Sequence, residues 1–397
     1  MIDPADMKIA VSTAAVPYVL RNFQLDWDIF QLSIDEWCQK MHEHTRSEAV
    51  QFTSGTMKHC DTPYWERFRT HEQLTFQEFA KKSKEDNAFK DRWYSHSYRD
   101  IVVWPDTLKK SISFAKFGFE NANDILFWLG SPGANTPCHY DTYGFNIVVQ
   151  VFGRKSWLLF PPSTPLTPTR VPFEESSVYC TQNFYSPDRM EQFGDVGKNR
   201  DAFEVILNPG DVLIVPAHWW HYVENLDTSL TVNTWIPLDA KDCLARLGEC
   251  FIRMQIDQIT ADDSDFIAGE LRNYIYNPNE MNEPDLNLMN LFKPLADVVI
   301  ENTKNGDPLD SHESQQCGRT VRDKFLNVFC KLEPVSHDRF RQILLQNSIR
   351  YNHSFDGRRL SGSKFKEVEN IINAVCHPKT VTSACQLYVQ QVRNQNS

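Results

Sequence analysis

The fold is decided by the segment Phe145-Asn146-Ile147-Val148-Val149-Gln150-Val151-Phe152-Gly153-Arg154-Lys155-Ser156-Trp157-Leu158-Leu159-Phe160. Two runs of β-branched and aromatic residues are joined by a Gly-Arg pair, which predicts two strands with a turn between them. Similar short runs occur at residues 124–129, 212–215 and 230–236. Many short strands separated by turn signals are typical of a sandwich or a barrel. We therefore expect a mainly β core over residues 107–238.

The chain before this core and one stretch inside it have a different residue pattern. Residues 1–106 mix α and β patterns: Ala10–Leu20 is strand-like, whereas Ser33–His42 and Thr75–Lys82 have the pattern of helices. The proline-rich stretch 161–200 interrupts the predicted strands. A loop of this length within a compact domain is usually functional.

Residues 239–397 show helical periodicity. Apolar residues recur on one face at Cys243, Leu244, Leu247, Phe251 and Met254, and similar stripes recur at 286–300, 340–349 and 365–376. This region follows the last predicted strand without a flexible linker. We therefore expect the helical unit to pack on the barrel and to be required for its stability.

Composition excludes several classes of protein. With 397 residues, 41% of them hydrophobic and 12% aromatic, the chain can form two or three structural units and is too apolar for a disordered protein. No apolar run has the length of a membrane span. The ten cysteines contain no C-x-x-C pair. We interpret them as reduced thiols in a cytoplasmic protein, with the nucleus as a second location.

Charge is unevenly distributed along the chain. The net charge of −11 disfavours binding of nucleic acid by the surface as a whole. Residues 315–397, however, hold 13 Lys or Arg against 6 Asp or Glu. The simplest interpretation of this basic region is a solvated helical surface, and the alternative is a docking surface for an acidic partner.

The chemistry is concentrated in Thr136-Pro137-Cys138-His139-Tyr140-Asp141. Because side chains alternate along a strand, His139 and Asp141 can both point into a barrel. With one more imidazole they would form the two-His, one-carboxylate set that binds Fe(II) and leaves positions open. The same spacing occurs in His59-Cys60-Asp61, but no strand pattern follows it, and we assign that triplet to a loop.

The residues themselves leave two candidates for the second histidine. Pro216-Ala217-His218-Trp219-Trp220-His221 contains His218 at a turn and His221 among bulky aromatic residues. Lys155 shares a face with Trp157 and Leu159, where a lysine is costly unless it meets an anion. Beside an iron site, that anion could be the distal carboxylate of 2-oxoglutarate.

These motifs, together with Pro209-Gly210-Asp211 and the strand after it, resemble the JmjC-domain 2-oxoglutarate oxygenases. The resemblance covers residues 124–238 and is strongest to the small hydroxylase branch, including its members associated with small heat-shock proteins. It implies a double-stranded β-helix, the cupin or jelly-roll barrel, that uses Fe(II), 2-oxoglutarate and O2. It also implies roles for eight residues: His139, Asp141 and His221 as catalytic metal ligands, and Thr136, Lys155, Asn146, Asn233 and Tyr94 around the cosubstrate, with Tyr98 as the alternative to Tyr94.

The resemblance further implies an activity and partners. Hydroxylation of a protein side chain is favoured over removal of N-methyl groups, and a small heat-shock protein is the implied partner, with a role in the stress response. Two alternatives stay open: a scaffold without catalysis that binds a small heat-shock protein, and an oxygenase that acts on RNA or on N-methyl groups. Members of this family often form homodimers through C-terminal helices.

Overall fold

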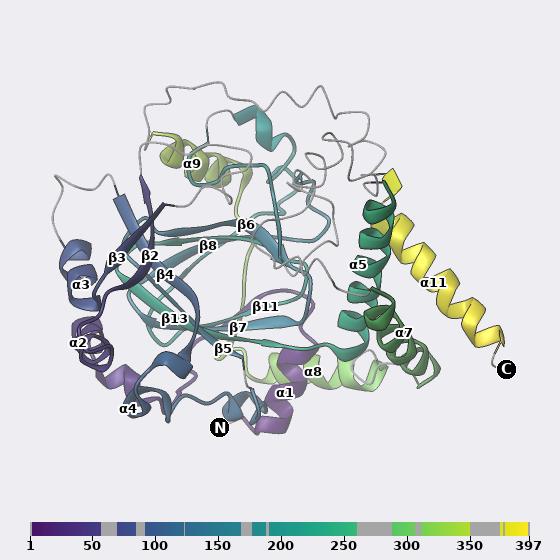
Figure 1. Ribbon diagram of the computed structural model, residues 1–397, viewed down its shortest axis with the longest axis horizontal. Helices are drawn as coiled ribbons and strands as arrows, with labels where there is room; N and C mark the ends of the chain where they lie inside the picture. Colours follow the sequence, from purple (N-terminus) through teal and green to yellow (C-terminus); the bar gives the residue numbers. More distant parts are fainter. Residues whose placement is uncertain are drawn as a thin grey trace.

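The protein is described here by a computed structural model. The described residues are 2–56, 70–84, 92–122, 124–167, 177–187, 190–259, 288–305, 311–349, 374–375 and 378–395. Two antiparallel sheets face each other, and in Figure 1 the smaller sheet lies above the larger one, with helices on the outside. This arrangement confirms the predicted double-stranded β-helix with a helical C-terminal region.

Within the described residues the larger sheet has nine strands in the order β14-β1-β11-β7-β13-β5-β4-β2-β3. Its strands are β1 (Tyr18–Leu20), β2 (Val50–Thr56), β3 (Thr70–Leu74), β4 (Arg92–Asp100), β5 (Ile125–Gly130), β7 (Phe145–Phe152), β11 (Val212–Val215), β13 (Ser229–Ile236) and β14 (Phe329–Lys331). All eight residues of β7 are buried, because β7 lies between β11 and β13 and is covered on both faces. The β-branched residues of this strand suit that position.

The smaller sheet has five strands within the same described residues, in the order β10-β8-β12-β6-β9. Its strands are β6 (Asn135–Asp141), β8 (Lys155–Phe160), β9 (Ser177–Tyr179), β10 (Phe203–Leu207) and β12 (Trp220–Asn225). The stretch 161–200, expected to be a functional loop, supplies β9 and buries Phe184 and Phe193 in a hydrophobic cluster over this sheet. Its described part is therefore packed structure.

The N-terminal region contributes four strands to the larger sheet and carries helices α1 (Pro4–Ser12), α2 (Ile34–His44), α3 (Phe76–Lys84) and α4 (Asp106–Lys109). The expected helices at 33–42 and 75–82 are confirmed, and Ser33 caps α2 in a capping box. The expected strand over Ala10–Leu20 is largely wrong. Asp3 caps a helix that continues through Ser12, and only Tyr18–Leu20 is extended.

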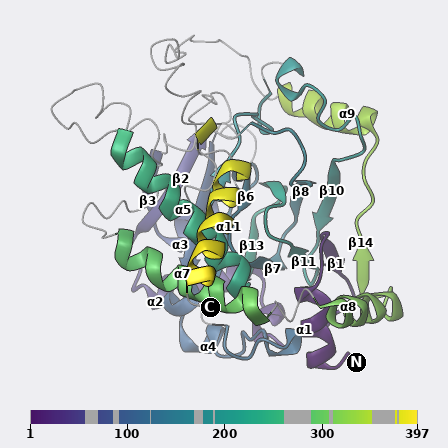
Figure 2. The ribbon, with the colours of Figure 1, turned by 90° about the vertical axis from the view of Figure 1, so that its right-hand side faces the viewer.

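The C-terminal region divides into two groups of elements (Figure 2). The first contains α8 (His312–Lys324), β14 and α9 (His337–Ser348). It packs on the barrel: α8 lies against α1, β14 extends the larger sheet beside β1, and Phe340 of α9 joins the cluster over the smaller sheet. For this group the expected packing is confirmed, although β14 is a strand inside a region expected to be helical.

The second group contains α5 (Asp239–Ile259), α7 (Leu288–Asn305) and α11 (Pro378–Gln395), which lie side by side in both views. Here the expected packing is confirmed for the polar face of α5, whose Asp242 and Arg246 contact Gly144 and Tyr143 of the barrel, and is wrong for its apolar stripe. Leu247 and its neighbours on the stripe form a separate hydrophobic cluster with α7 and α11, and Met254 at the end of the stripe is 37% exposed. An amphipathic face does not specify which apolar surface covers it. The stripe expected at 365–376 lies almost wholly outside the described residues.

Two expectations concern the described residues as a whole. None of the described helices has the length and apolar character needed to cross a membrane. The eight cysteines that the structure describes are all free thiols.

Candidate metal and cosubstrate site

Two neighbouring strands bring the three expected metal ligands together. His139 of β6 and His221 of β12 are direct partners across the antiparallel pair, and Asp141 lies two residues further along β6 on the same face. Their ligand atoms all lie within 4.8 Å of one another, and all three residues are buried. His139 Nε2 is 3.7 Å from Asp141 Oδ1, and the two imidazole rings are 4.1 Å apart.

Backbone contacts define which nitrogen each imidazole offers. Nδ1 of His139 is 2.7 Å from the carbonyl oxygen of Pro137, and Nδ1 of His221 is 2.9 Å from that of Trp219. A carbonyl only accepts, so each Nδ1 carries a proton and donates. The Nε2 lone pair of each ring is then available to a metal ion, which is the usual arrangement for histidine ligands.

The carboxylate is held from two sides. Trp235 Nε1 donates to Asp141 Oδ2 at 2.9 Å, and Ser177 Oγ donates to Oδ1 at 3.4 Å. The following turn is fixed by Asp242 of α5, whose carboxylate accepts from the backbone N–H of Gly144 at 2.8 Å. Gly144 has φ +61°, and a Cβ there would lie 2.5 Å from a backbone oxygen of β13, so the turn requires glycine.

Lys155 lies in the same cavity as the two histidines. Its ammonium donates to Thr231 Oγ1 at 3.0 Å and to the carbonyl oxygen of Trp128 at 3.3 Å. Both partners are neutral, and burial lowers the pKa of Lys155 to about 7. A buried cation with only neutral partners is suited to bind an anion.

The polar residues implied for the cosubstrate also line this cavity: Thr136, Asn146 and Asn233. Asn233 links two of its walls, because its Oδ1 accepts from Trp128 Nε1 at 2.8 Å and its Nδ2 donates to Asn146 Oδ1 at 2.8 Å. The cavity thus combines a potential metal site with a fixed set of polar groups and aromatic walls. The donor set and the buried lysine fit Fe(II) and a dicarboxylate cosubstrate.

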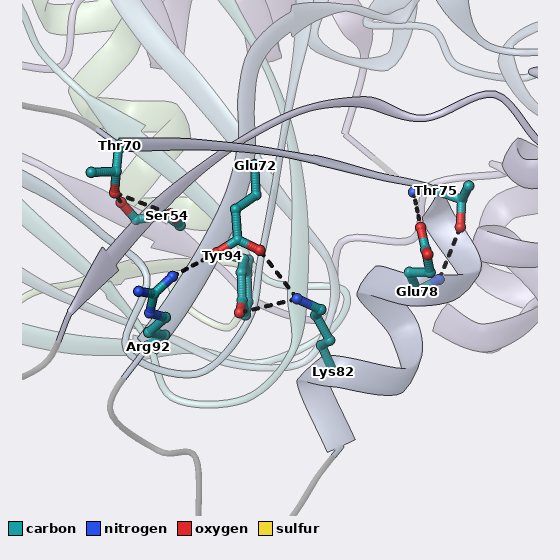
Figure 3. A network of polar contacts seen from close by, with 8 residues as sticks. All are labelled: Ser54, Thr70, Glu72, Thr75, Glu78, Lys82, Arg92 and Tyr94. Carbon is teal, nitrogen blue, oxygen red and sulfur yellow. Dashed lines mark hydrogen bonds and ion pairs between the residues drawn. The ribbon is translucent and has the colours of Figure 1, made fainter.

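Tyr94 does not reach this cavity, and its placement beside the cosubstrate is corrected. Figure 3 shows its hydroxyl beside Lys82, at 3.5 Å from Nζ, in a network with Glu72. Tyr94 and His96 alternate onto the face of β4 that lies against α3 and the larger core. A bulge after Ser97 then changes the alternation.

Tyr98, the extra residue of this bulge, is the tyrosine that lies near the cavity. It has φ +57°, and its ring contacts Trp128 and Trp235, with ring centres 5.6 and 6.1 Å away. The side chain is 62% exposed. Tyr98 therefore stands at the outer edge of the two cavity walls.

The other histidine candidates lie elsewhere. His218 is in the turn before β12 with φ +66°, and its Nε2 is 3.2 Å from the carbonyl oxygen of Thr142. It does not join the triad found among the described residues. The triplet at 59–61 lies outside the described residues.

Sequence reasoning missed three residues that contact the site: Trp128, Thr231 and Trp235. Thr231, Asn233 and Trp235 alternate on one face of β13. Because Asn233 was expected at the site, strand alternation alone could have identified its two neighbours. No comparable signal points to Trp128, whose contribution to Lys155 is a backbone carbonyl.

Comparison with known proteins agrees with this geometry. Residues 4–237, more than half of the chain, match the cupin-like domain. The chain belongs to the JmjC-type cupin-like family. It is 36% identical to human HSPB1-associated protein 1 over 274 residues, which are 64% of this chain and 54% of that protein.

Two further relatives match shorter segments. Jumonji C domain-containing protein 5 of Drosophila melanogaster is 32% identical over 114 residues, covering 29% of this chain and 28% of that protein. Lysine-specific demethylase JMJ30 of Arabidopsis thaliana is 32% identical over 138 residues, covering 34% of this chain and 30% of that protein. Against the HSPB1-associated proteins of mammals, the match spans little more than half of the relative's length.

Proposed function

We propose that this protein is an Fe(II)- and 2-oxoglutarate-dependent oxygenase that hydroxylates a protein side chain. The observation that carries the proposal is the convergence of His139, Asp141 and His221, of which the two histidines line a cavity that also contains the buried Lys155. Two imidazoles and one carboxylate with open positions are the donor set of Fe(II) oxygenases. A scaffold without catalysis has no physical need to place these groups beside a buried lysine that donates to neutral oxygens.

The bound metal and cosubstrate would supply the oxidising chemistry, in which O2 and 2-oxoglutarate yield succinate, CO2 and a hydroxylated product. The protein's own residues would bind the metal and orient the cosubstrate. Nε2 of each histidine and a carboxylate oxygen of Asp141 hold the metal, while Lys155 and Thr136 bind the distal carboxylate of the cosubstrate. Fixing both ends of the cosubstrate gives the preorganised geometry on which such catalysis depends.

The test is consumption of 2-oxoglutarate by the purified protein with Fe(II) and O2, measured as succinate formed. We expect succinate from the wild-type protein and none above background from Asp141→Ala. If the wild-type protein forms no succinate and is not stabilised thermally by Fe(II) with 2-oxoglutarate, the proposal is wrong. Thermal stabilisation detects cosubstrate binding where turnover without a prime substrate is slow.

A small heat-shock protein is the proposed partner. The support is the name of the mammalian relatives, HSPB1-associated protein 1. Incubation of purified HSPB1 with this protein, Fe(II) and 2-oxoglutarate distinguishes hydroxylation of HSPB1 from binding alone. A mass gain of one oxygen that depends on 2-oxoglutarate supports hydroxylation, whereas complex formation without a mass change, and without succinate, supports a scaffold without catalysis. Formaldehyde release from a methylated partner would instead indicate demethylation.

A further inference from the structure

Trp157 carries a polar atom that the site described so far does not use. Its side chain lines the cavity and is 5% exposed. Its Nε1 is buried and has no hydrogen-bond partner among the described residues. Buried donors are nearly always paired in native proteins, so an unpaired donor on a residue that lines the cavity is a candidate to bind a ligand there.

The other two indoles of the cavity already have acceptors. Trp128 Nε1 donates to Asn233, and Trp235 Nε1 donates to Asp141. The ring of Trp157 stacks on His221, with ring centres 5.7 Å apart and an angle of 28° between the planes. Stacking requires an aromatic ring but not an N–H, so it accounts for the ring and leaves the donor unexplained.

Strand register places Trp157 at the level of the cosubstrate. His221 is paired with His139 on one side and with Leu159 on the other, which defines the row of the metal ligands. The next row on the same face of the sheet contains Thr136, Val223 and Trp157.

The following row on this face contains the backbone of Lys155, which is paired with Asn225. The row of Trp157 therefore lies between the metal ligands and the backbone of the lysine. It is also the row of Thr136, which binds the distal carboxylate in the proposed function.

A carboxylate can accept more bonds than these two residues donate. It has two oxygens with about four lone-pair positions, and two of the three protons of the Lys155 ammonium already go to Thr231 and Trp128. A third donor within the cavity would satisfy the anion more completely. Trp157 Nε1 is the indole donor there that still lacks an acceptor among the described residues.

We propose that Trp157 is a cosubstrate-binding residue whose Nε1–H donates to the distal carboxylate of 2-oxoglutarate, beside Lys155 and Thr136. This inference rests on the proposed function. Without the N–H, the cosubstrate loses one hydrogen bond to a charged group while the aromatic ring on His221 is retained.

The experiment compares Trp157→Phe with a matched control, Trp104→Phe. Trp104 is also a buried tryptophan whose Nε1 has no partner in the described part of the chain, but it lies in the core of the larger sheet and not at the cavity. Binding of 2-oxoglutarate and of 2-oxobutanoate is measured anaerobically by calorimetry on the Fe(II)-loaded protein. The second compound keeps the metal-chelating 2-oxo acid and lacks the distal carboxylate.

We expect Trp157→Phe to weaken 2-oxoglutarate binding by about 10- to 150-fold, equivalent to 1.5–3 kcal/mol for a hydrogen bond to a charged group. Binding of 2-oxobutanoate and of Fe(II) should be unchanged, as should all binding to Trp104→Phe. Unchanged 2-oxoglutarate affinity in Trp157→Phe, or an equal loss for both 2-oxo acids, would overturn the inference. If the wild-type protein itself binds neither 2-oxo acid, the proposed function fails instead.

Discussion

Replacing Lys155 with methionine should stabilise the free protein and abolish its response to 2-oxoglutarate. The lysine is buried, its hydrogen bonds go to neutral oxygens, and burial lowers its pKa to about 7. A methionine of similar length fills the same space without a charge to desolvate. The substitution therefore separates the stability of the fold from the binding of the anion.

The magnitude follows from the pKa. A fall from 10.5 to about 7, with one pKa unit equal to 1.36 kcal/mol, makes the charged lysine unfavourable by on the order of 5 kcal/mol in the folded state. The methionine variant also loses the two hydrogen bonds of the lysine, and each loss reduces the gain in stability by about 1 kcal/mol. A net gain of about 1–4 kcal/mol is therefore expected, in the range found when buried ionic groups are replaced by apolar ones.

The gain should depend on pH in a defined direction. Below pH 7 the lysine is charged in both the folded and the unfolded protein, so the full penalty of burying the charge is present. Between pH 7 and 10.5 only the unfolded protein holds the proton, and the penalty shrinks by about 1.4 kcal/mol per pH unit. The advantage of methionine should be greatest at or below pH 7 and disappear at about pH 9, before the charge penalty itself vanishes near pH 10.5, because the neutral lysine keeps its hydrogen bonds.

Urea unfolding of Lys155→Met and wild type at pH 6.5, 7.5 and 9 measures this difference. Lys81→Met, at an exposed position on α3, is the control and should show no such trend. Thermal stabilisation by 2-oxoglutarate with Fe(II) should be present in wild type and lost in Lys155→Met. A variant that is less stable than wild type at pH 6.5, or an advantage that does not decline with pH, would refute the reasoning.

Three other outcomes are expected. Lys155 must take up a proton to pair with a carboxylate, so calorimetry should show that 2-oxoglutarate affinity falls above pH 7 and that binding takes up a proton. An affinity that is constant from pH 6.5 to 9 would argue against a neutral Lys155 in the protein without cosubstrate. Trp235→Phe removes the hydrogen bond to Asp141 and should weaken Fe(II) binding by about 10- to 100-fold in a metal titration. Phe340→Ala should cost about 3–5 kcal/mol in urea unfolding, whereas Leu247→Ala in the separate helical cluster should leave Fe(II) affinity unchanged.

The sequence predicted those parts of the fold that depend on local patterns. Alternation of His139 and Asp141 along one strand correctly implied that both side chains share a face, and β-branched runs such as Phe145–Phe152 marked buried strands. The partner of each strand was not predictable from the same information. The pairing of His221 with His139, on which the triad depends, joins residues 82 positions apart.

The errors arose where tertiary contacts override local pattern. The run Ala10–Leu20 has strand-forming residues, but Asp3 and Pro4 begin a helix that buries Met7 and Val11. The stripe on α5 is amphipathic as expected, yet its apolar face is covered by α7 and α11 and not by the barrel. The choice between Tyr94 and Tyr98 could not be made from the sequence, because a bulge at Tyr98 changes which side of β4 this residue faces and the sequence gives no sign of a bulge.

The central claim is that His139, Asp141 and His221 form one iron site, and anaerobic Fe(II) titration tests it most directly. We expect one Fe(II) per chain in the wild-type protein. Affinity should fall by more than about 100-fold in His139→Ala and in Asp141→Ala, since loss of an outer partner alone costs 10- to 100-fold. His59→Ala, which removes the other His-x-Asp triplet, should bind like wild type. Undiminished iron binding in His139→Ala, or an equal loss in His59→Ala, would contradict the account.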